Sequence, residues 1–551
     1  MMTEYFSLYQ KRIWIIMVIC LNLEFVHSLP YVEEQNSKPY KILVSMTDPT
    51  SMHSRTSQMA VVSKALLERG HSVTLLVPSN KGMKGFEEAF NHAIVYDVAF
   101  KQPEVDELKE KMMRTALGIP DDEPGWNLLR PLAIVDRYLA FFMKSCYGVF
   151  ENETIQERLE KDGFDLMIQN AINPCDVLLA ESLNIPYVTM TSSIRQTFFD
   201  EVTVSIPTPS SYVPFSLSKS FTDDMPFLQR TSNFIFRHAI GSCIKWYAHS
   251  LFSEIQREHN VSVHKTFGEL VGRSQLWLAH TDFSLDFPRP IGPAWIPVGG
   301  LLHSETKPIP KDLENFVQGA GKHGVIIFSL GSMVTSLMDG ELDELFAKVF
   351  SELPQRVLWR YVGPKPRGLG KNTRVMKWLP QNDLLGHPQT RLLIYHGGIN
   401  GVYEAIYHQV PMVLLPIFAD QPAMGARVSK KGMGVVLERA KLSHDTIKAA
   451  IEEVINNPKY KANIEHYGSI HRDTITSPLE TAVFWIEHVL KFGGDHLRLR
   501  GRDLNFFVLN SFDVLTFFIV ISLVILYTNY LVLRTCYRCC CRKNTRKQKS
   551  D

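Results

Sequence analysis

The sequence predicts an α/β protein made of two consecutive parallel-sheet domains and one membrane-spanning helix. At 551 residues the chain is too long for a single hydrophobic core, so two domains are expected. Short β-branched runs alternate with helical patterns in both halves, which is typical of βαβ units. Near the end, residues 514–533 are mostly apolar. They are long enough to cross a hydrocarbon layer of about 30 Å as a transmembrane helix.

The first half begins with a strand, a helix and a second strand. KILVS (Lys41–Ser45) predicts the first strand, SQMAVVSKALLERGH predicts a helix ending at Gly70, and HSVTLLVP (His71–Pro78) predicts the next strand. This order within about 40 residues predicts a parallel pair. FDLMIQN (Phe164–Asn170) and YVTM (Tyr187–Met190) extend the same sheet.

A proline-rich passage at residues 288–311 predicts the linker between the halves. We expect an N-terminal domain over 29–300 and a C-terminal domain over 301–500, facing each other across a ligand-binding cleft. No glycine follows the first strand in VSMTDPTSMH, which disfavours a nicotinamide-dependent dehydrogenase. Six runs predict the strands of the second half: GVIIFSLGS, RVLWRYVG, TRVMKWLP, TRLLIYHGG, PMVLLPIF and GVVLERA.

Both ends of the chain indicate membrane targeting. Lys11 and Arg12 precede an apolar run, and a small residue at Ser28 predicts a signal peptide over 1–28. A retained anchor is the alternative, although the run is short for a span. Seven Lys or Arg lie in 534–551, so we expect a cytosolic basic tail and a lumenal position for the body of the protein. The final KQKSD resembles a dilysine retrieval signal, which predicts a single-pass type I protein of the endoplasmic reticulum membrane. A basic stop-transfer cluster would look similar.

Charge, cysteines and glycan motifs fit this layout. A net charge of +2 gives no case for a nucleic-acid partner. Asn152 in NET and Asn260 in NVS are predicted glycan acceptors, which require surface exposure. Four cysteines beside the membrane predict palmitoylation rather than a zinc site: Cys536, Cys539, Cys540 and Cys541. Three others remain in the lumenal part, so at most one disulfide forms there: Cys146, Cys175 and Cys243.

The stretch YHGGINGVYEAIYHQVPMVLLPIFADQP (residues 395–422) predicts a ligand site. Its glycines let backbone amides approach a ligand, and His396 and the following helix start can donate to a diphosphate. Asn400 and Glu404 are four apart and lie on one helix face. A carboxylate there suits the two hydroxyls of a ribose. After the next strand, Asp420 and Gln421 can bind the hydroxyls of a sugar.

Upstream, KWLPQNDLLGHP adds an aromatic face for a base at Trp378 and an amide at Gln381. Each of these residues alone is more often packing or solvated surface. Their order along the chain indicates a nucleotide sugar as ligand. No metal is expected, because helix starts and His396 can neutralise the diphosphate and no Asp-x-Asp motif lies near the donor residues.

The stretch WLPQNDLLGHPQTRLLIYHGGINGVYEAIYHQVPMVLLPIFADQP resembles the signature of the UDP-glucuronosyltransferase family, the animal two-domain UDP-glycosyltransferases. The similarity extends to FSLGSMV (328–334), VGGLLHSETKPIP, TAVFWIEHV and the membrane anchor, and so covers essentially the whole chain. It implies two Rossmann-like domains (the GT-B fold), with the sugar donor in the C-terminal half and the acceptor in the N-terminal half.

The resemblance also implies residue roles. Trp378 would stack on uracil, Gln381 and Glu404 would hold the ribose, and Asp420 and Gln421 would bind the sugar. The family usually has Thr or Ser before His-Gly-Gly, where this chain has Tyr395. This bulkier ring either crowds the phosphate or points into the sheet. Four residues would hold the diphosphate: Ser332, His396, Gly398 and Asn400.

Inverting transfer to an alcohol needs a base near the acceptor oxygen. In the family the base is a histidine at the first helix start, held by an aspartate at the end of a later strand. The family spacing falls on Arg55 here, so we assign His53 on the premise of a two-residue loop insertion. The aspartate position holds Asn170, which can orient an imidazole but cannot stabilise its charged form. We therefore expect a slow transferase, an acidic phenol acceptor, or another nearby carboxylate in this role.

The leading hypothesis is a membrane-anchored glycosyltransferase that moves a sugar, glucuronate by family preference, from a UDP-sugar co-substrate to a hydroxyl of a small lipophilic acceptor. No further cofactor is expected, and oligomers with itself or with family relatives are compatible with it. The alternative is a catalytically weakened UDP-sugar-binding partner of active relatives. These two hypotheses share the donor residues and differ at His53 and Asn170. A lipid or steroid carrier is a third hypothesis, and it predicts no affinity for UDP.

Overall fold

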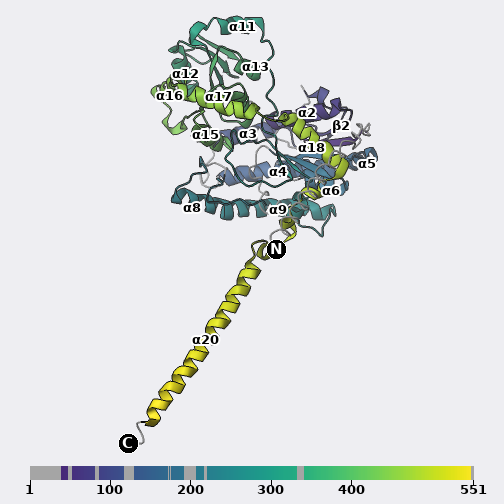
Figure 1. Cartoon of the computed structure of the whole chain (residues 1–551). Helices are drawn as coiled ribbons and strands as arrows, with labels where there is room; N and C mark the ends of the chain where they lie inside the picture. The colour runs from purple at the N-terminus through teal and green to yellow at the C-terminus, as the bar shows by residue number, and fades with distance from the viewer. Residues whose placement is uncertain are drawn as a thin grey trace, which may run out of the picture. The chain divides into compact units, whose positions relative to one another are not determined.

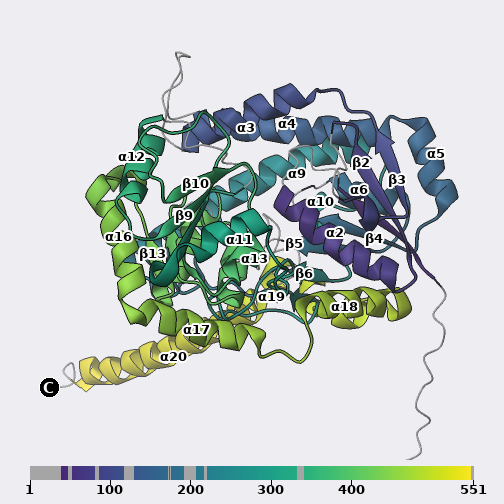
Figure 2. The same cartoon turned by 90° about the horizontal axis from the view of Figure 1, so that it is seen from above.

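The computed structural model describes residues 39–46, 53–80, 86–116, 130–171, 173, 175–191, 206–215, 220–331 and 340–547. The predicted signal peptide at 1–28 and the predicted phosphate ligand Ser332 lie outside these residues. The described chain forms two sheets whose strand pairs are all parallel. Figures 1 and 2 show the two sheets with helices packed around them.

The first sheet has the order β3-β2-β1-β4-β5-β6-β7 and the second the order β10-β9-β8-β11-β12-β13. Strands of the first sheet are β1 (Lys41–Ser45), β2 (Ser72–Pro78), β3 (His92–Tyr96), β4 (Leu166–Asn170), β5 (Tyr187–Thr191), β6 (Trp277–Ala279) and β7 (Trp295–Pro297). Strands of the second sheet are β8 (Val325–Ser329), β9 (Arg356–Arg360), β10 (Thr373–Met376), β11 (Thr390–Tyr395), β12 (Met412–Leu414) and β13 (Gly434–Val436).

Helices follow most of the strands, as expected of βαβ units. Those up to the linker are α2 (His53–Glu68), α3 (Gln102–Ala116), α4 (Arg130–Phe150), α5 (Glu153–Asp162), α6 (Cys175–Ser182), α8 (Phe227–Ile235), α9 (Gly241–Glu258) and α10 (Phe267–Val271). Those after it are α11 (Lys311–Gln318), α12 (Gly340–Ser351), α13 (Gln381–Leu385), α14 (Ile399–Tyr407), α15 (Gln421–Lys430), α16 (His444–Asn456), α17 (Pro458–Arg472), α18 (Pro478–Phe492), α19 (Phe506–Leu509) and α20 (Phe512–Lys547).

Every strand expected from a β-branched or apolar run is present, but three others were not foreseen. β3, β6 and β7 were missed, and β6 and β7 have only three residues each. Such runs are too short to show a period along the sequence. The linker prediction over 288–311 needs a correction, because β7 lies inside it and completes the first sheet by pairing with β6.

The strand order places the predicted site residues. In both sheets the order reverses between the first and fourth strands of the sheet, that is β1 beside β4 and β8 beside β11. In doubly wound sheets, ligands bind outside the carboxyl ends of the strands at such a reversal. Asn170 is the last residue of β4, and His396 directly follows β11. The α2 helix begins at His53, after β1.

The core is built from strands that are apolar on both faces. All five residues of β8 are buried, and so are the last four of β11. This pattern is expected of a parallel sheet covered by helices on both sides. A disulfide between Cys146 on α4 and Cys175 at the start of α6 adds a covalent link beside β4. Cys243 is exposed and unbonded. One disulfide among these three cysteines matches the expectation.

The chain after α17 returns to the first sheet. Arg69, just after α2, donates to Glu480 and Glu487 of α18, with 2.9 Å between Nη1 and the Glu487 carboxylate. His71 Nε2 lies 3.2 Å from the same carboxylate. Figure 2 shows α18 running beside α2. Residues late in the chain therefore pack against the N-terminal half.

The last helix is the membrane candidate. Within α20, the stretch Phe512–Cys539 is 28 residues long and apolar enough to cross a membrane, and none of it is buried. It contains the predicted span at 514–533. Figure 1 shows α20 as one continuous helix.

Candidate functional site

The turn between β11 and α14 is built around the His396 ring. Gly397 has φ +88°, which glycine adopts without strain, and Gly398 caps α14 in an extended conformation. A Cβ atom at Gly398 would lie 2.6 Å from the His396 ring, and one at Gly331 would lie 2.4 Å from it. The ring is thus held between the backbone turns that follow β8 and β11.

His396 is a neutral imidazole. Burial, together with the nearby Arg360 guanidinium, lowers the pKa of His396 to about 3. The ring nitrogen Nδ1 is buried and has no hydrogen-bond partner among the described residues. A neutral imidazole beside the start of α14 can donate its one N–H to a phosphate oxygen without carrying a positive charge.

Arg360 belongs to this site, although sequence reasoning treated RVLWRYVG only as a strand. It is the last residue of β9, donates to the carbonyl of Gly331, and lies 5.6 Å from the Trp378 ring centroid. Burial lowers its pKa, but a guanidinium stays charged at any physiological pH. A cation at the carboxyl end of a strand near the order reversal was the signal that could have identified it. Trp378 itself is 59% exposed.

The residue pair predicted for the ribose is brought together. Gln381, the first residue of α13, donates from Nε2 to Glu404 Oε2 of α14 at 2.6 Å. Burial raises the pKa of Glu404 to about 7. With a pKa near 7, the ionised form of this carboxylate is stabilised by hydrogen bonds from hydroxyl groups, which a ribose provides.

Tyr395 points into the fold, as the second of the two interpretations expected. Its side chain is 6% exposed and belongs to the core between the second sheet and α14. A Cβ atom at Gly401 would lie 2.4 Å from the ring, so this glycine makes room for the tyrosine. Its hydroxyl bonds with Gln381, and burial raises its pKa. The Tyr395 ring therefore helps to position Gln381, which bonds to Glu404.

The two residues predicted for the sugar differ in their surroundings. Gln421 is buried, and its Oε1 accepts from the backbone N–H groups of Ile417 at 2.7 Å and Phe418 at 3.1 Å. Its amide oxygen thus fixes the loop after β12, and its NH2 group takes no part in these two bonds. Asp420 is partly exposed at the N-cap position of α15, without a side-chain capping bond.

Asn400 connects the second sheet to the first. Its Oδ1 accepts from Gln58 Nε2 of α2 at 2.7 Å. The same Gln58 nitrogen lies 3.0 Å from His280 Nδ1, and His280 Nε2 accepts from the backbone N–H of Gly300 at 3.0 Å. No motif in the sequence pointed to Gln58 or His280. Their hydrogen bonds fix the first helix of the N-terminal half against the predicted diphosphate turn.

The predicted catalytic pair is described only in part. His53 opens α2, but its side chain lies outside the described part of the chain. Asn170 is 8% exposed at the end of β4, where its carbonyl accepts from the Asn173 N–H at 3.1 Å.

A carboxylate that sequence reasoning missed lies at the same sheet edge. Asp176, in the first turn of α6, is 1% exposed. Its Oδ1 accepts from Ser45 Oγ at 2.8 Å and from Asn173 Nδ2 at 3.2 Å. Ser45 is the last residue of β1, so Asp176 stands between the ends of β1 and β4. Whether it takes the role of the aspartate missing at Asn170 is a proposal, taken up below.

The structure describes both predicted glycan acceptors. Asn260 is exposed at a turn after α9, with φ +53°. Asn152 caps α5, and its Oδ1 accepts from the Ile155 N–H at 3.1 Å. Within the described ranges, no group of three or more His, Cys, Asp or Glu is arranged to bind a metal ion.

Comparisons with known proteins find relatives over most of the chain. A family profile described as UDP-glucoronosyl and UDP-glucosyl transferase matches residues 41–547. UDP-glucuronosyltransferase 2B23 of Macaca fascicularis is 35% identical, over 91% of this chain and 94% of that protein. UDP-glucuronosyltransferase 2A2 of Mus musculus is 39% identical, over 83% of this chain and 87% of that protein.

Solved structures share the fold at low sequence identity. The calicheamicin glycosyltransferase CalG4 aligns with a TM-score of 0.55 at 17% identity, covering 83% of this chain and 99% of that one. The glycosyltransferase VinC, solved in complex with DTDP, aligns with a TM-score of 0.52 at 17% identity, covering 82% of this chain and 99% of that one. With the two parallel sheets described above, these matches confirm the GT-B fold.

Proposed function

Because this chain belongs to the family of UDP-glucuronosyl and UDP-glucosyl transferases and is a glycosyltransferase, we propose that it moves a sugar from a UDP-sugar to a hydroxyl of a small lipophilic acceptor. Glucuronate is the first candidate for the sugar, since the similar curated proteins are named for it. The transfer inverts the anomeric centre and uses no metal.

The observation that carries the proposal is the hydrogen bond between Gln58 and Asn400. Gln58 lies five residues after His53 on α2, a rise of about 7.5 Å along the helix. Asn400 lies in the first turn of α14, beside the His396 turn. The bond thus supports a site in which the start of α2, with its base, is near the donor diphosphate.

The donor is held by the groups of the second sheet. Trp378 stacks on uracil, the Gln381–Glu404 pair opens to take the ribose hydroxyls, and Gln421 and Asp420 bind the sugar. The diphosphate lies against His396, Asn400, the backbone at Gly398, and Ser332. Arg360 joins them, since its guanidinium is within reach of both Trp378 and the His396 turn.

The reaction is a single displacement. His53 takes the proton from the acceptor hydroxyl, whose oxygen forms a bond to the anomeric carbon while the bond from that carbon to the diphosphate oxygen breaks. Charge that develops on the leaving diphosphate is stabilised by the His396 N–H, the amides at the start of α14 and Arg360. Asp176 supplies the negative charge that Asn170 lacks, and so favours the imidazolium that forms on the base.

The proposed membrane topology and modification sites follow those expected for the family. We place α20 in the endoplasmic reticulum membrane, with the catalytic body in the lumen and the basic tail in the cytosol. The signal peptide at 1–28, glycans on Asn152 and Asn260, and association with itself or with relatives belong to the same proposal.

A matrix of donors and acceptors tests the function. The full chain is purified in a non-ionic detergent and incubated with UDP-glucuronate, UDP-glucose, UDP-xylose or UDP-N-acetylglucosamine and a panel of phenols and alcohols. We expect a glycoside product by mass spectrometry with at least one donor, and none with His53→Ala. UDP binding by calorimetry is measured on both proteins.

The outcomes separate the two hypotheses. A wild-type protein that binds UDP but forms no product with any pair would contradict the enzyme and favour the UDP-sugar-binding partner. Full activity in His53→Ala would remove the proposed base. Undetectable UDP binding by a folded protein would contradict the donor site as a whole and leave the carrier hypothesis.

A further inference from the structure

A second pocket lies away from the donor and acceptor residues. It has a volume of about 240 Å³ and is lined by residues before β6, residues before β7, and the segment after α18. Trp277 and Trp295, which line it, are the first residues of β6 and β7. Because the strands are parallel, the pocket is at the amino edge of the first sheet, opposite the edge that carries Asn170 and α2. It is therefore no part of the transferase site.

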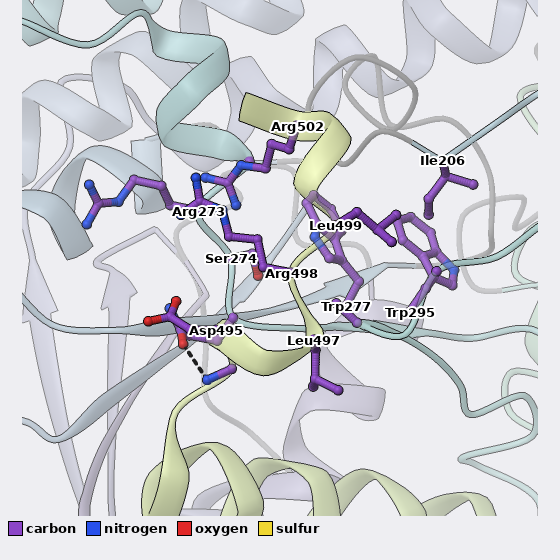
Figure 3. A pocket seen from close by; sticks show the side chains of 15 residues that line it. Ile206, Arg273, Ser274, Trp277, Trp295, Asp495, Leu497, Arg498, Leu499 and Arg502 are labelled. Carbon is purple, nitrogen blue, oxygen red and sulfur yellow. Dashed lines mark hydrogen bonds between the residues drawn. The ribbon is translucent and has the colours of Figure 1, made fainter. Parts of the chain in front are cut away.

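One side of this pocket carries three arginines, two of which are paired with carboxylates. Three arginines line it, namely Arg273, Arg498 and Arg502, against one lining acid, Asp495. Arg273 Nε lies 2.8 Å from Glu181, and Arg498 is paired with Asp503. Figure 3 shows Arg502 and Arg498 on the segment after α18, and the side chain of Arg273 extending away from Arg502.

Arg502 is the unusual member. It is partly buried, and within the described residues no carboxylate lies at ion-pair distance from it. Burial and the neighbouring Arg498 and Arg273 lower its pKa. A half-buried cation beside two other cations is costly to hold, and a bound anion removes that cost.

The opposite wall is apolar. The indole rings of Trp277 and Trp295 stack at 5.3 Å with 10° between their planes, and both residues are at most 2% exposed. Ile206 and Leu499 extend this wall. Figure 3 shows Trp295, Ile206 and Leu499 on the side away from Arg273. A ligand that fits both walls has an anionic head and an apolar part.

The pocket is tethered close to the membrane candidate. Arg502 precedes Phe512, the first residue of α20, by ten residues. An extended chain of that length reaches at most about 35 Å. Phe506 and Phe507 of the intervening α19 are 65% and 66% exposed, as expected of side chains near a bilayer interface.

We propose that this pocket binds a phosphate group that carries an apolar substituent, and that its source is the headgroup of an anionic membrane lipid. Arg502 and Arg498 bind the phosphate, and Ile206, Leu499 and the tryptophan pair contact the glycerol and the first acyl carbons. Only the choice of a lipid as source rests on the proposed membrane anchoring. The pocket itself does not depend on the transferase activity.

The test uses the full chain in a non-ionic detergent and three probes. These are dihexanoyl phosphatidic acid, dihexanoyl phosphatidylcholine and inorganic phosphate, each titrated by calorimetry and by thermal unfolding. We expect phosphatidic acid to bind and to raise the Tm, phosphatidylcholine to bind at least tenfold more weakly, and inorganic phosphate to bind more weakly still. Arg502→Gln and Arg498→Gln should each weaken binding of phosphatidic acid about 10-fold to 100-fold.

Arg500→Gln is the matched control. Arg500 lies between the two pocket arginines and carries the same charge, but it does not line the pocket and is 83% exposed. UDP binding, measured on each variant, reports folding independently of the pocket. In addition, Leu499→Ala removes apolar contact without changing charge and should weaken phosphatidic acid but not inorganic phosphate.

Each result decides the proposal. Equal affinity for phosphatidic acid and inorganic phosphate, lost in the same arginine variants, would support the phosphate site and assign it to a soluble ion instead of a lipid. No binding of any probe by a protein that binds UDP would overturn it. So would an effect of Arg500→Gln equal to that of Arg502→Gln, since binding would then depend on net charge alone.

Discussion

Gln58 and Asn400 are 342 positions apart in the sequence, yet the amide of one donates to the amide of the other at 2.7 Å. The bond gives Asn400 Oδ1 an acceptor role, so that donation to a diphosphate falls to its NH2 group. Gln58 is 4% exposed, and the same nitrogen lies close to His280. The buried amide of Gln58 thus orients Asn400, a proposed diphosphate-binding residue, and fixes the helix that begins with the proposed base.

Gln58→Met tests this link. Methionine has a similar volume but no donor, so Asn400 and His280 lose a buried hydrogen bond, which costs about 1–3 kcal/mol. We expect a Tm lower by several degrees and a kcat/KM for transfer reduced about tenfold. Thermal unfolding and initial rates measure the two effects. Gln318→Met is the control, because Gln318 is exposed on α11 and its side chain donates to Glu314 of the same helix. Equal effects of the two substitutions would remove the role given to Gln58.

His396 should act as a neutral donor. With a pKa of about 3, its imidazole is uncharged throughout the range from pH 6 to pH 8. His396→Ala should therefore weaken UDP binding about tenfold, by the same factor at pH 6 and at pH 8. Calorimetry at both pH values measures this, with His323→Ala as an exposed control. A loss confined to pH 6 would show that a charged imidazole binds the diphosphate.

Glu404 should make stability and UDP binding respond oppositely to pH. Its pKa is about 7 in the folded protein, against an ordinary value of 4.5 in the unfolded chain. Between these values the folded state holds the extra proton, so stability is highest below pH 4.5 and is lost as the pH rises through 7. Ribose hydroxyls need an ionised acceptor, so affinity for UDP should rise over the upper part of this range.

Glu404→Gln tests both trends at once. The variant has no group to titrate, so it should be more thermostable than the wild type at pH 8 without UDP and should bind UDP weakly at every pH. Thermal unfolding and calorimetry at pH 5.5 and pH 8 measure the two quantities. Glu305→Gln, at an exposed position, should leave both profiles unchanged. A wild-type UDP affinity that stays flat from pH 5.5 to pH 8 would contradict the role of the carboxylate.

The sequence predicted what depends on local pattern. The strand runs around Leu43 and Ile394 are continuous apolar segments between turn residues, and both are core strands. The His396 turn was readable because glycines and a histidine follow such a strand directly. Arg360 was missed because its place depends on the neighbouring turn, where the carbonyl of Gly331 accepts from it. Strand β7 was missed because three residues among prolines show no period.

Contacts between segments distant in the sequence could not be predicted. Nothing near Gln58 or Asn400 indicates that they bond, since their relation depends on how the two sheets face each other. The return of α18 to α2 is of the same kind, because Arg69 and Glu487 meet only once the fold has formed. The chemical character of a side chain could be predicted from its own segment. Its interaction partners, 300 or more residues away, could not.

Asp176 is the carboxylate proposed to stabilise the charged form of the base. Asp176 lies between the ends of β1 and β4, bonded to Ser45 and Asn173, at the edge where Asn170 replaces the aspartate of the family. Asp176→Asn should reduce kcat about 10-fold to 100-fold for an alcohol acceptor. The loss should be smaller for an acidic phenol, which needs less help in releasing its proton. The acidic limb of the pH–rate profile should also move to lower pH, because the base loses a stabilising charge.

Two further variants distinguish charge from structure. Ser45→Ala removes the hydrogen bond to Asp176 but leaves its charge, so it should lower stability while moving the pH–rate profile little. Asn170→Asp combined with Asp176→Asn restores one carboxylate to the sheet edge and should recover most of the lost kcat. A purely structural role for Asp176 predicts the reverse, with Ser45→Ala as damaging as Asp176→Asn and no recovery in the double variant. Rates for one alcohol and one phenol across pH 5.5–9, with Tm measured alongside, separate the two accounts.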